Sequence, residues 1–182
     1  MKRKHLSSIL PAIALCLIAL VALAALAADW IAPYSHHFRR AASLLAPPGG
    51  DHVLGTDGQG RDILSLLLHG ARVALLVGFG ATLVSMCIGI PLGLISGWRR
   101  GTVDSLLMGV TEVVFAFPGI LLAILLVFIT QQPSIFNVML ALSATGWAGW
   151  ARLVRGQVLQ EREKDYVKMA ITAGAGTTRI LG

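Results

Sequence analysis

Long uncharged blocks alternate with charged segments along the chain. The uncharged blocks cover 6–28, 73–98 and 113–151. A helix needs about 20 residues, each rising 1.5 Å, to cross a hydrocarbon core about 30 Å thick. The third block is almost twice that length, and Gln131-Gln132-Pro133-Ser134 interrupts it with a sequence typical of a turn. The pattern therefore predicts four membrane-spanning helices, over 6–28, 73–98, 106–130 and 134–153.

The first block has a second interpretation. It follows the basic start Lys2-Arg3-Lys4 and ends with Ala25-Leu26-Ala27, which is also the pattern of a cleavable signal peptide. The apolar core of a signal peptide usually has about 7–15 residues, and this run is longer. The residues alone favour a retained helix and leave the signal peptide open.

The basic residues indicate the orientation. Cytoplasmic connections of membrane proteins carry an excess of Lys and Arg. With the N-terminus in the cytoplasm, eleven of the 15 basic residues lie inside, and only Arg39, Arg40, Arg61 and Arg72 lie outside. We therefore expect a multi-pass protein of the bacterial inner membrane with a cytoplasmic N-terminus and an external loop over 29–72.

Composition supports the membrane class. The chain is 55% hydrophobic and 13% charged, whereas soluble domains carry about 25% charged residues. The net charge of +6 does not indicate nucleic-acid binding, because no basic stripe is interleaved with aromatic residues. Cys16 and Cys87 lie inside apolar blocks and lack metal-ligand spacing. We expect a lipid bilayer as the surroundings and no nucleic-acid partner.

Small residues recur at every fourth position of the second predicted span. Such spacing forms a groove along which another helix backbone can approach closely. The residues of this groove are Ala81, Ser85, Gly89, Gly93 and Gly97. Pro91 and Pro118 lie inside predicted spans, and each is expected to kink its helix because it removes a backbone hydrogen bond.

Candidate chemistry is sparse. The segment 174–178 lacks the Lys of a phosphate-binding loop, and no nucleophile has a local base. His36, His37 and His52 could form an external metal site, but a solvated loop is the favoured interpretation. We expect no catalytic residue, no cofactor and no metal.

The segment after the fourth predicted span is more informative. A charged stretch over 160–165 is followed by Tyr166, Val167, Ala170 and Gly174 at helical spacing. This pattern predicts a cytoplasmic helix with one small apolar face. The face suits a partner protein, and it equally suits the chain's own bundle or lipid.

Several segments together resemble the C-type permease subunits of oligopeptide, dipeptide and nickel ABC importers. The external stretch His52–Asp62 is similar to a Leu-Gly-Thr-Asp-x-x-Gly-Arg-Asp signature, and 165–175 resembles the Glu-Ala-Ala loop of import permeases. Further matching segments are Gly101–Asp104, Phe115–Pro118 and Trp150–Gly156.

The resemblance implies an all-α, polytopic bundle that holds four spans of a normally six-helix fold. It implies an N-terminal anchor and loop over 1–50, an external signature segment over 51–72, and a permease domain over 73–182 with a coupling helix at 160–178. The signature residues are Gly55, Thr56, Asp57, Gly60, Arg61 and Asp62. The residues implied to dock on the ATPase are Tyr166, Val167, Ala170, Gly174 and Ala175.

The function implied is a permease, not an enzyme, that imports small peptides or nickel. Its implied partners are ABC ATPase subunits, a second permease and an external substrate-binding protein. Lys168, Met169 and Leu66 depart from the family pattern. Family members continue through two further helices, so the alternative expectation is a truncated, non-transporting membrane remnant or scaffold.

Overall fold

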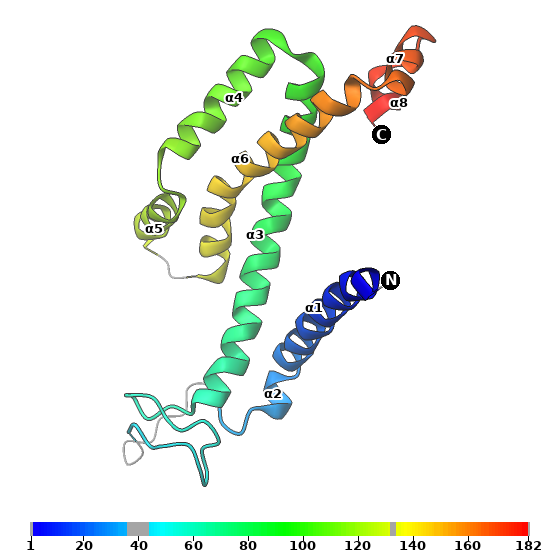
Figure 1. Ribbon diagram of the computed structural model, residues 1–182. Helices are drawn as coiled ribbons and strands as arrows, with labels where there is room; N and C mark the ends of the chain where they lie inside the picture. Colours follow the sequence, from blue (N-terminus) through cyan, green and yellow to red (C-terminus); the bar gives the residue numbers. More distant parts are fainter. Residues whose placement is uncertain (1, 36–43, 132–133, 182) are drawn as a thin grey trace. The chain divides into compact units, whose positions relative to one another are not determined.

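The computed structural model describes residues 2–35, 44–131 and 134–181, and every regular element in these ranges is an α-helix. The all-α prediction is therefore confirmed. The helices are α1 (Lys2–Leu26), α2 (Ala28–Ile31), α3 (Ile63–Arg99), α4 (Gly101–Ala116), α5 (Gly119–Thr130), α6 (Ile135–Arg162), α7 (Asp165–Thr172) and α8 (Thr177–Leu181) (Figure 1).

The chain forms two compact units, residues 1–76 and 77–182, and the boundary falls inside α3. In the first unit, α2 is joined to the start of α3 through Asp29. Arg72 lies 2.6 Å from one Asp29 carboxylate oxygen, and His69 lies 3.4 Å from the other. These contacts connect the end of the N-terminal helical segment to the first part of α3.

The two internal prolines of the predicted spans behave differently. α3 runs without interruption through Pro91. At Pro118 the helix breaks: α4 ends at Ala116, Phe117 is extended, and α5 begins at Gly119 at an angle of 82° to α4. Proline disfavours the helical conformation of the residue before it, which explains the extended Phe117. The segment 106–130, predicted as one span with a kink at Pro118, is therefore divided into two helices at this proline.

One described helix, α3, is long and apolar enough to cross a membrane on its own. The bent pair α4–α5 counts as a second crossing if it is taken as one broken span, and the described apolar part of α1, Pro11–Leu26, is shorter than a span. α6 does not qualify, because Asn137, Arg152 and small residues lower its hydropathy. The prediction of four membrane-spanning helices is not confirmed. In the predicted break between spans, Gln132 and Pro133 lie outside the described residues.

In the second unit, α6 packs backbone to backbone on α3 (Figure 1). A Cβ atom at Gly89 would lie 2.5 Å from the carbonyl oxygen of Trp147, and a Cβ at Gly93 would lie 2.5 Å from that of Ala151. A Cβ at Gly97 would lie 2.8 Å from the Cβ of Val158. Glycine is therefore the only residue that permits this approach without displacement of α6.

The contact between α3 and α6 continues along the groove of small residues toward its first two members. Ala81 and Ser85 are buried, and the Ser143 hydroxyl donates to the Ala81 carbonyl at 3.2 Å. A Cβ at Gly146 would lie 2.5 Å from the Ser85 hydroxyl oxygen. The structure thus places all five residues of the groove against α6, and we call this the α3–α6 zipper.

We predict that alanine at Gly93 destabilises the protein and that alanine at Gly78 does not. Gly78 lies on the same helix with open space around it, so its replacement should stabilise the helix by about 0.5–1 kcal/mol. The added methyl at Gly93 meets the α6 backbone and should cost about 1–3 kcal/mol. Thermal unfolding in detergent measures both variants. A Gly93→Ala protein as stable as Gly78→Ala would contradict the close approach.

Candidate functional site

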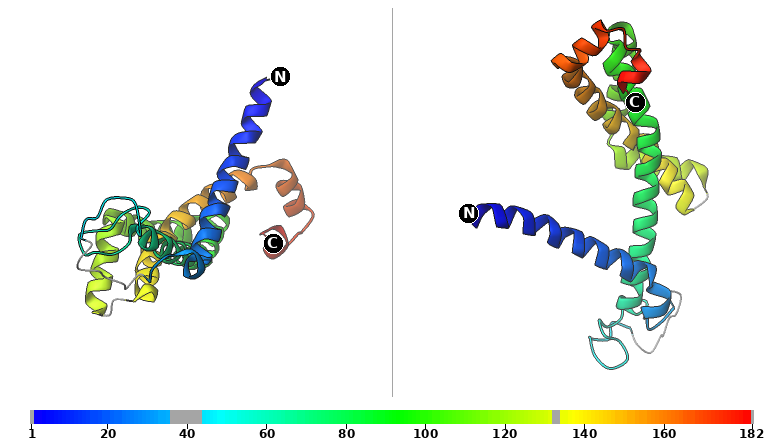
Figure 2. Two further views of the ribbon diagram at one scale, coloured as in Figure 1. Left: turned by 90° about the horizontal axis from the view of Figure 1, so that it is seen from below. Right: turned by 90° about the vertical axis from the view of Figure 1, so that its right-hand side faces the viewer.

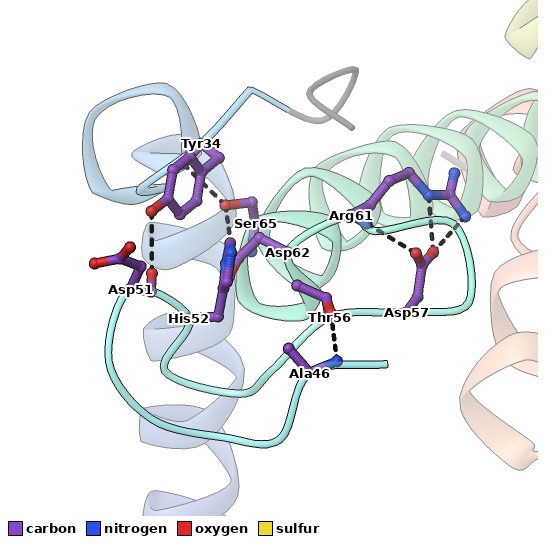
Figure 3. Close-up of polar contacts among 9 residues, drawn as sticks. All are labelled: Tyr34, Ala46, Asp51, His52, Thr56, Asp57, Arg61, Asp62 and Ser65. Carbon is purple, nitrogen blue, oxygen red and sulfur yellow. Dashed lines mark hydrogen bonds and ion pairs between the residues drawn. The ribbon is translucent and has the colours of Figure 1, made fainter. Parts of the chain in front are cut away.

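The first half of the external signature is bound to the chain that precedes it. Gly55 has φ +77°, and a Cβ there would overlap the carbonyl oxygen of Ala46. Thr56 donates its backbone N–H to Ala46 at 3.1 Å, and its hydroxyl oxygen accepts the Ala46 N–H at 2.8 Å (Figure 3). Gly55 and Thr56 therefore hold the signature against the backbone at Ala46.

The second half of the signature forms a turn around one carboxylate. One oxygen of Asp57 accepts the backbone N–H groups of Gln59 and Arg61 at 2.8 and 2.9 Å. The other oxygen accepts the Arg61 guanidinium through two nitrogens, each at 2.8 Å (Figure 3). Gly60 completes the turn with φ +71°. The hydrogen bond from the Arg61 backbone is the main cause of a lowered pKa of Asp57. The charges of Asp57 and Arg61 are thus paired with each other inside the turn.

Asp62 links the loop to α3. It stands immediately before the helix and is 4% exposed. One carboxylate oxygen accepts the backbone N–H and the hydroxyl of Ser65, both at 2.8 Å. The other oxygen lies 3.0 Å from Nδ1 of His52. Burial alone would raise the pKa of Asp62, but the hydrogen bonds from Ser65 and His52 outweigh it and lower the pKa. Asp62 therefore acts as the N-terminal cap of α3.

Tyr34 completes this cluster, and it was not among the residues expected from the sequence. Its ring lies 5.0 Å from the His52 ring, its backbone N–H donates to the Ser65 hydroxyl at 3.1 Å, and its hydroxyl donates to the Asp51 carbonyl at 3.1 Å (Figure 3). A polar aromatic residue just after an apolar block was the available signal. The contacts return the chain after α2 to the start of α3.

Of the three histidines considered as a possible metal site, the structure describes only His52. His36 and His37 lie outside the described residues. His52 is buried against Asp62, and its Nε2 atom has no hydrogen-bond partner. Within the described ranges, no group of three metal-ligating side chains is close enough to hold an ion. The arrangement around His52 fits a structural contact of the loop.

The predicted coupling helix over 160–178 is divided into three pieces. α6 continues to Arg162, α7 covers Asp165–Thr172, and α8 begins at Thr177. α7 ends at Thr172, and Gly174, two residues beyond this end, has φ +81°. The Gly174 N–H donates to the Ile171 carbonyl and the Ala175 N–H donates to the Ala170 carbonyl, both at 3.0 Å. This is the Schellman arrangement, which needs a left-handed residue and is usually built on glycine.

α7 and α8 enclose a small concave surface. The hollow has a volume of about 270 Å³, and we call it the α7–α8 surface. It contains four of the five residues expected to dock on an ATPase. Val167 is 4% exposed, whereas Tyr166 is 59% exposed and donates its hydroxyl to Glu161. The lining residues are Tyr166, Val167, Ala170, Ala175, Arg179 and Ile180.

Side chains at the end of α3 contact α6, α8 and Glu163. Figure 2 shows the backbone path through α7 and α8 to the C-terminus. Arg162 donates to the Trp98 carbonyl oxygen, and its guanidinium lies 5.1 Å from the Trp98 ring. The indole N–H of Trp98 donates to the Thr177 hydroxyl at 3.1 Å. Arg100 forms an ion pair with Glu163 at 2.8 Å. The Trp98 carbonyl, a terminal α3 group without a partner inside the helix, is thus satisfied by Arg162 of α6.

A three-helix ion pair lies beside these contacts, and sequence reasoning did not identify it. Arg155 on α6 binds Asp104 on α4 through Nε at 2.5 Å and through a terminal nitrogen at 2.7 Å. The buried Ser96 of α3 donates its hydroxyl to the same carboxylate. Asp104 and Arg155 each lie in a segment that carries the family resemblance. The signal was two opposite charges at the ends of uncharged blocks.

The comparison with known families identifies a matching profile. The family described as "Binding-protein-dependent transport system inner membrane component" matches residues 89–182. This range contains the second half of the α3–α6 zipper, the three-helix ion pair and the α7–α8 surface. It does not contain the external signature.

Curated relatives match a larger part of the chain. It is 36% identical over 175 residues to the oligopeptide transport system permease protein OppC of Bacillus subtilis, which covers 96% of this chain and 57% of the relative. It is 42% identical over 135 residues to the dipeptide transport system permease protein DppC of the same organism (74% and 42%). A di/tripeptide permease protein DppC of Pseudomonas aeruginosa is 39% identical over 170 residues (89% and 55%).

The chain spans about half the length of the curated relatives it matches. These relatives are permease components of transport systems, so the resemblance to C-type permease subunits is confirmed, as is the expectation that the chain is not itself an enzyme. With the profile over more than half of its residues and permease relatives over nearly all of them, the chain belongs to the family of binding-protein-dependent transport system inner membrane components.

Proposed function

We propose that the chain is the transmembrane permease subunit of an ABC importer that moves small peptides across the bacterial inner membrane. The observation that carries the proposal is the α7–α8 surface, which lies beyond the end of α6 and gathers the residues of the Glu-Ala-Ala-like loop. The relatives named above are permeases of oligopeptide, dipeptide and di/tripeptide systems, which favours peptides over nickel.

The α7–α8 surface is suited to a protein partner. It combines small residues, Ala170 and Ala175, with an exposed aromatic ring at Tyr166. Aromatic residues next to small ones provide both an anchor and room for an incoming side chain. We assign this surface to a separate ATPase subunit, whose movement on ATP binding would reach the permease through α7.

The local charges support the same assignment. Lys168 stands where the family pattern has a Glu, and it lies 3.5 Å from Glu163. Hydrogen bonds from Arg100 and then from Lys168 lower the pKa of Glu163, which keeps this carboxylate charged beside them. Lys168 therefore shares the Glu163 carboxylate with Arg100, which offsets part of its positive charge. The departure from the pattern does not leave an isolated cation at the proposed interface.

The remaining partners follow from the exposed faces. α5 exposes a continuous set of large apolar side chains, which suits lipid or a second permease subunit. An external substrate-binding protein would deliver the peptide on the side of the 46–65 loop. The exposed large apolar residues of α5 are Ile120, Leu121, Ile124, Leu125, Phe128 and Ile129.

The first prediction concerns the ATPase contact. Ala170→Glu places a charge in the α7–α8 surface and should lower co-purification of the ATPase by about tenfold or more, because about 1.4 kcal/mol of interface free energy corresponds to tenfold in affinity. Thr172→Glu is the matched control, since Thr172 is exposed and lies two residues further along α7, on the opposite side. Equal recovery of the ATPase with both variants would contradict the docking role.

The second prediction concerns the orientation. In a protein with Cys16 and Cys87 replaced by Ala, a cysteine at Gln59 should react with a membrane-impermeant maleimide in intact cells. A cysteine at Arg99 should react only after the membrane is opened. Both side chains are exposed, so access to the reagent decides the result. Labelling of the Arg99 position from the periplasm would reverse the proposed topology.

A further inference from the structure

The ion pair between Asp104 and Arg155 has the geometry of a specific contact. The Asp104 carboxylate receives two guanidinium nitrogens, at 2.5 and 2.7 Å, and the hydroxyl of Ser96. Ser96 is fully buried, and the side chains of Asp104 and Arg155 are 15% and 31% exposed. Two parallel charge-assisted hydrogen bonds fix distance and orientation together. An exposed ion pair with a single hydrogen bond would fix neither the distance nor the orientation of the two side chains.

The elements around this pair leave it little freedom. α4 begins at Gly101, directly after Arg100, so α3 and α4 are joined by a very short turn. Arg100 and Gly101 both have positive φ, at 53° and 63°. Asp104 lies in the first turn of α4, where a carboxylate is favoured by the helix dipole.

The zipper fixes the other partner. The position of Arg155 along α6 is set by the close approach of Gly93 and Gly97, since a Cβ at either glycine would meet backbone atoms of Arg155. The guanidinium is therefore delivered to Asp104 by backbone packing. Three helices meet at one carboxylate because α3 and α6 are in direct contact beside it.

The contacts form a continuous series toward the proposed ATPase surface. Beyond the ion pair come the Arg162 contact with Trp98, the Arg100–Glu163 ion pair and the Trp98–Thr177 hydrogen bond. We call the whole set the cytoplasmic clamp. Its members are Ser96, Trp98, Arg100 and Asp104 on the α3–α4 side and Arg155, Arg162, Glu163 and Thr177 on the other.

We propose that Asp104 and Arg155 are positioning residues that make α4 move together with the segment 163–181 when the ATPase changes state. This proposal rests on the proposed function, because it assigns a use to movement at the α7–α8 surface. α6 alone could transmit a push to α3 through the zipper. α4 and α5 both pack directly on α6, and the Asp104–Arg155 contact adds to this packing a directed polar link between α4 and α6.

The test measures a distance across the clamp in the complete complex of this chain with its ATPase. Spin labels are placed on cysteines at Ser105 of α4 and Thr172 of α7, both exposed positions, after Cys16 and Cys87 are changed to Ala. The distance distribution is recorded without nucleotide and after trapping with ATP and vanadate. We expect it to stay narrow and unshifted in the otherwise unchanged protein.

Asp104→Asn and Arg155→Gln should each broaden or shift the distance distribution in the trapped state while the ATPase remains bound. The ATP hydrolysed per labelled dipeptide transported should rise about tenfold, which is in the range of typical coupling effects. The double variant should be no worse than either single one, because both changes remove the same contact. Arg99→Gln removes a neighbouring exposed charge and should change neither measurement.

The clamp alone would be overturned by a distance that shifts on trapping in the unchanged protein. It would also be overturned if the Asp104→Asn and Arg155→Gln complexes behaved like Arg99→Gln. Additive losses in the double variant would also reject a shared contact. Absence of the ATPase from the unchanged complex would instead reject the proposed function, and with it the use assigned to the clamp. Loss of ATPase only in the variants would reduce the pair to a purely structural contact.

Discussion

The close approach of α3 and α6 is the interaction on which the second unit depends. Lipid offers no hydrophobic drive for helix association, so packing of backbones has to supply it. Gly89, Gly93 and Gly97 let α6 lie so near that its carbonyl groups face the α3 backbone. This contact sets the position of Arg155 and leads α6 past the end of α3. Both the ion pair with Asp104 and the α7–α8 surface are therefore located by it.

The sequence indicated this contact more clearly than the path of the chain around it. Small residues at every fourth position predicted a helix groove, because spacing alone places them on one face. The effect of proline was harder to predict: Pro91 lies within an unbroken helix, while Pro118 separates two helices that differ by 82°. Both prolines lack a backbone N–H, yet only Pro118 separates two helices. Whether the helix continues depends on whether surrounding groups satisfy the freed carbonyl, and the local sequence does not show this.

The polar contacts were the least predictable part. Asp104 and Arg155 are 51 residues apart, and their meeting requires the register of α3 on α6, which no local pattern supplies. Tyr34 joins the external cluster for a similar reason, because its partners follow a long loop. The conformation of Gly174 follows from local geometry, because the turn after α7 needs a left-handed residue and glycine adopts that conformation without strain.

The charged residues of the signature are paired within the signature segment itself. Asp57, Arg61 and Asp62 find their counter-charges or hydrogen-bond donors within ten residues along the chain. A loop that carries its own counterions depends little on ions in the medium, because partners at contact distance are screened less than distant ones. We therefore expect the segment to keep its form as the salt concentration varies, with the apolar side chains of Val53 and Leu54 exposed at its surface.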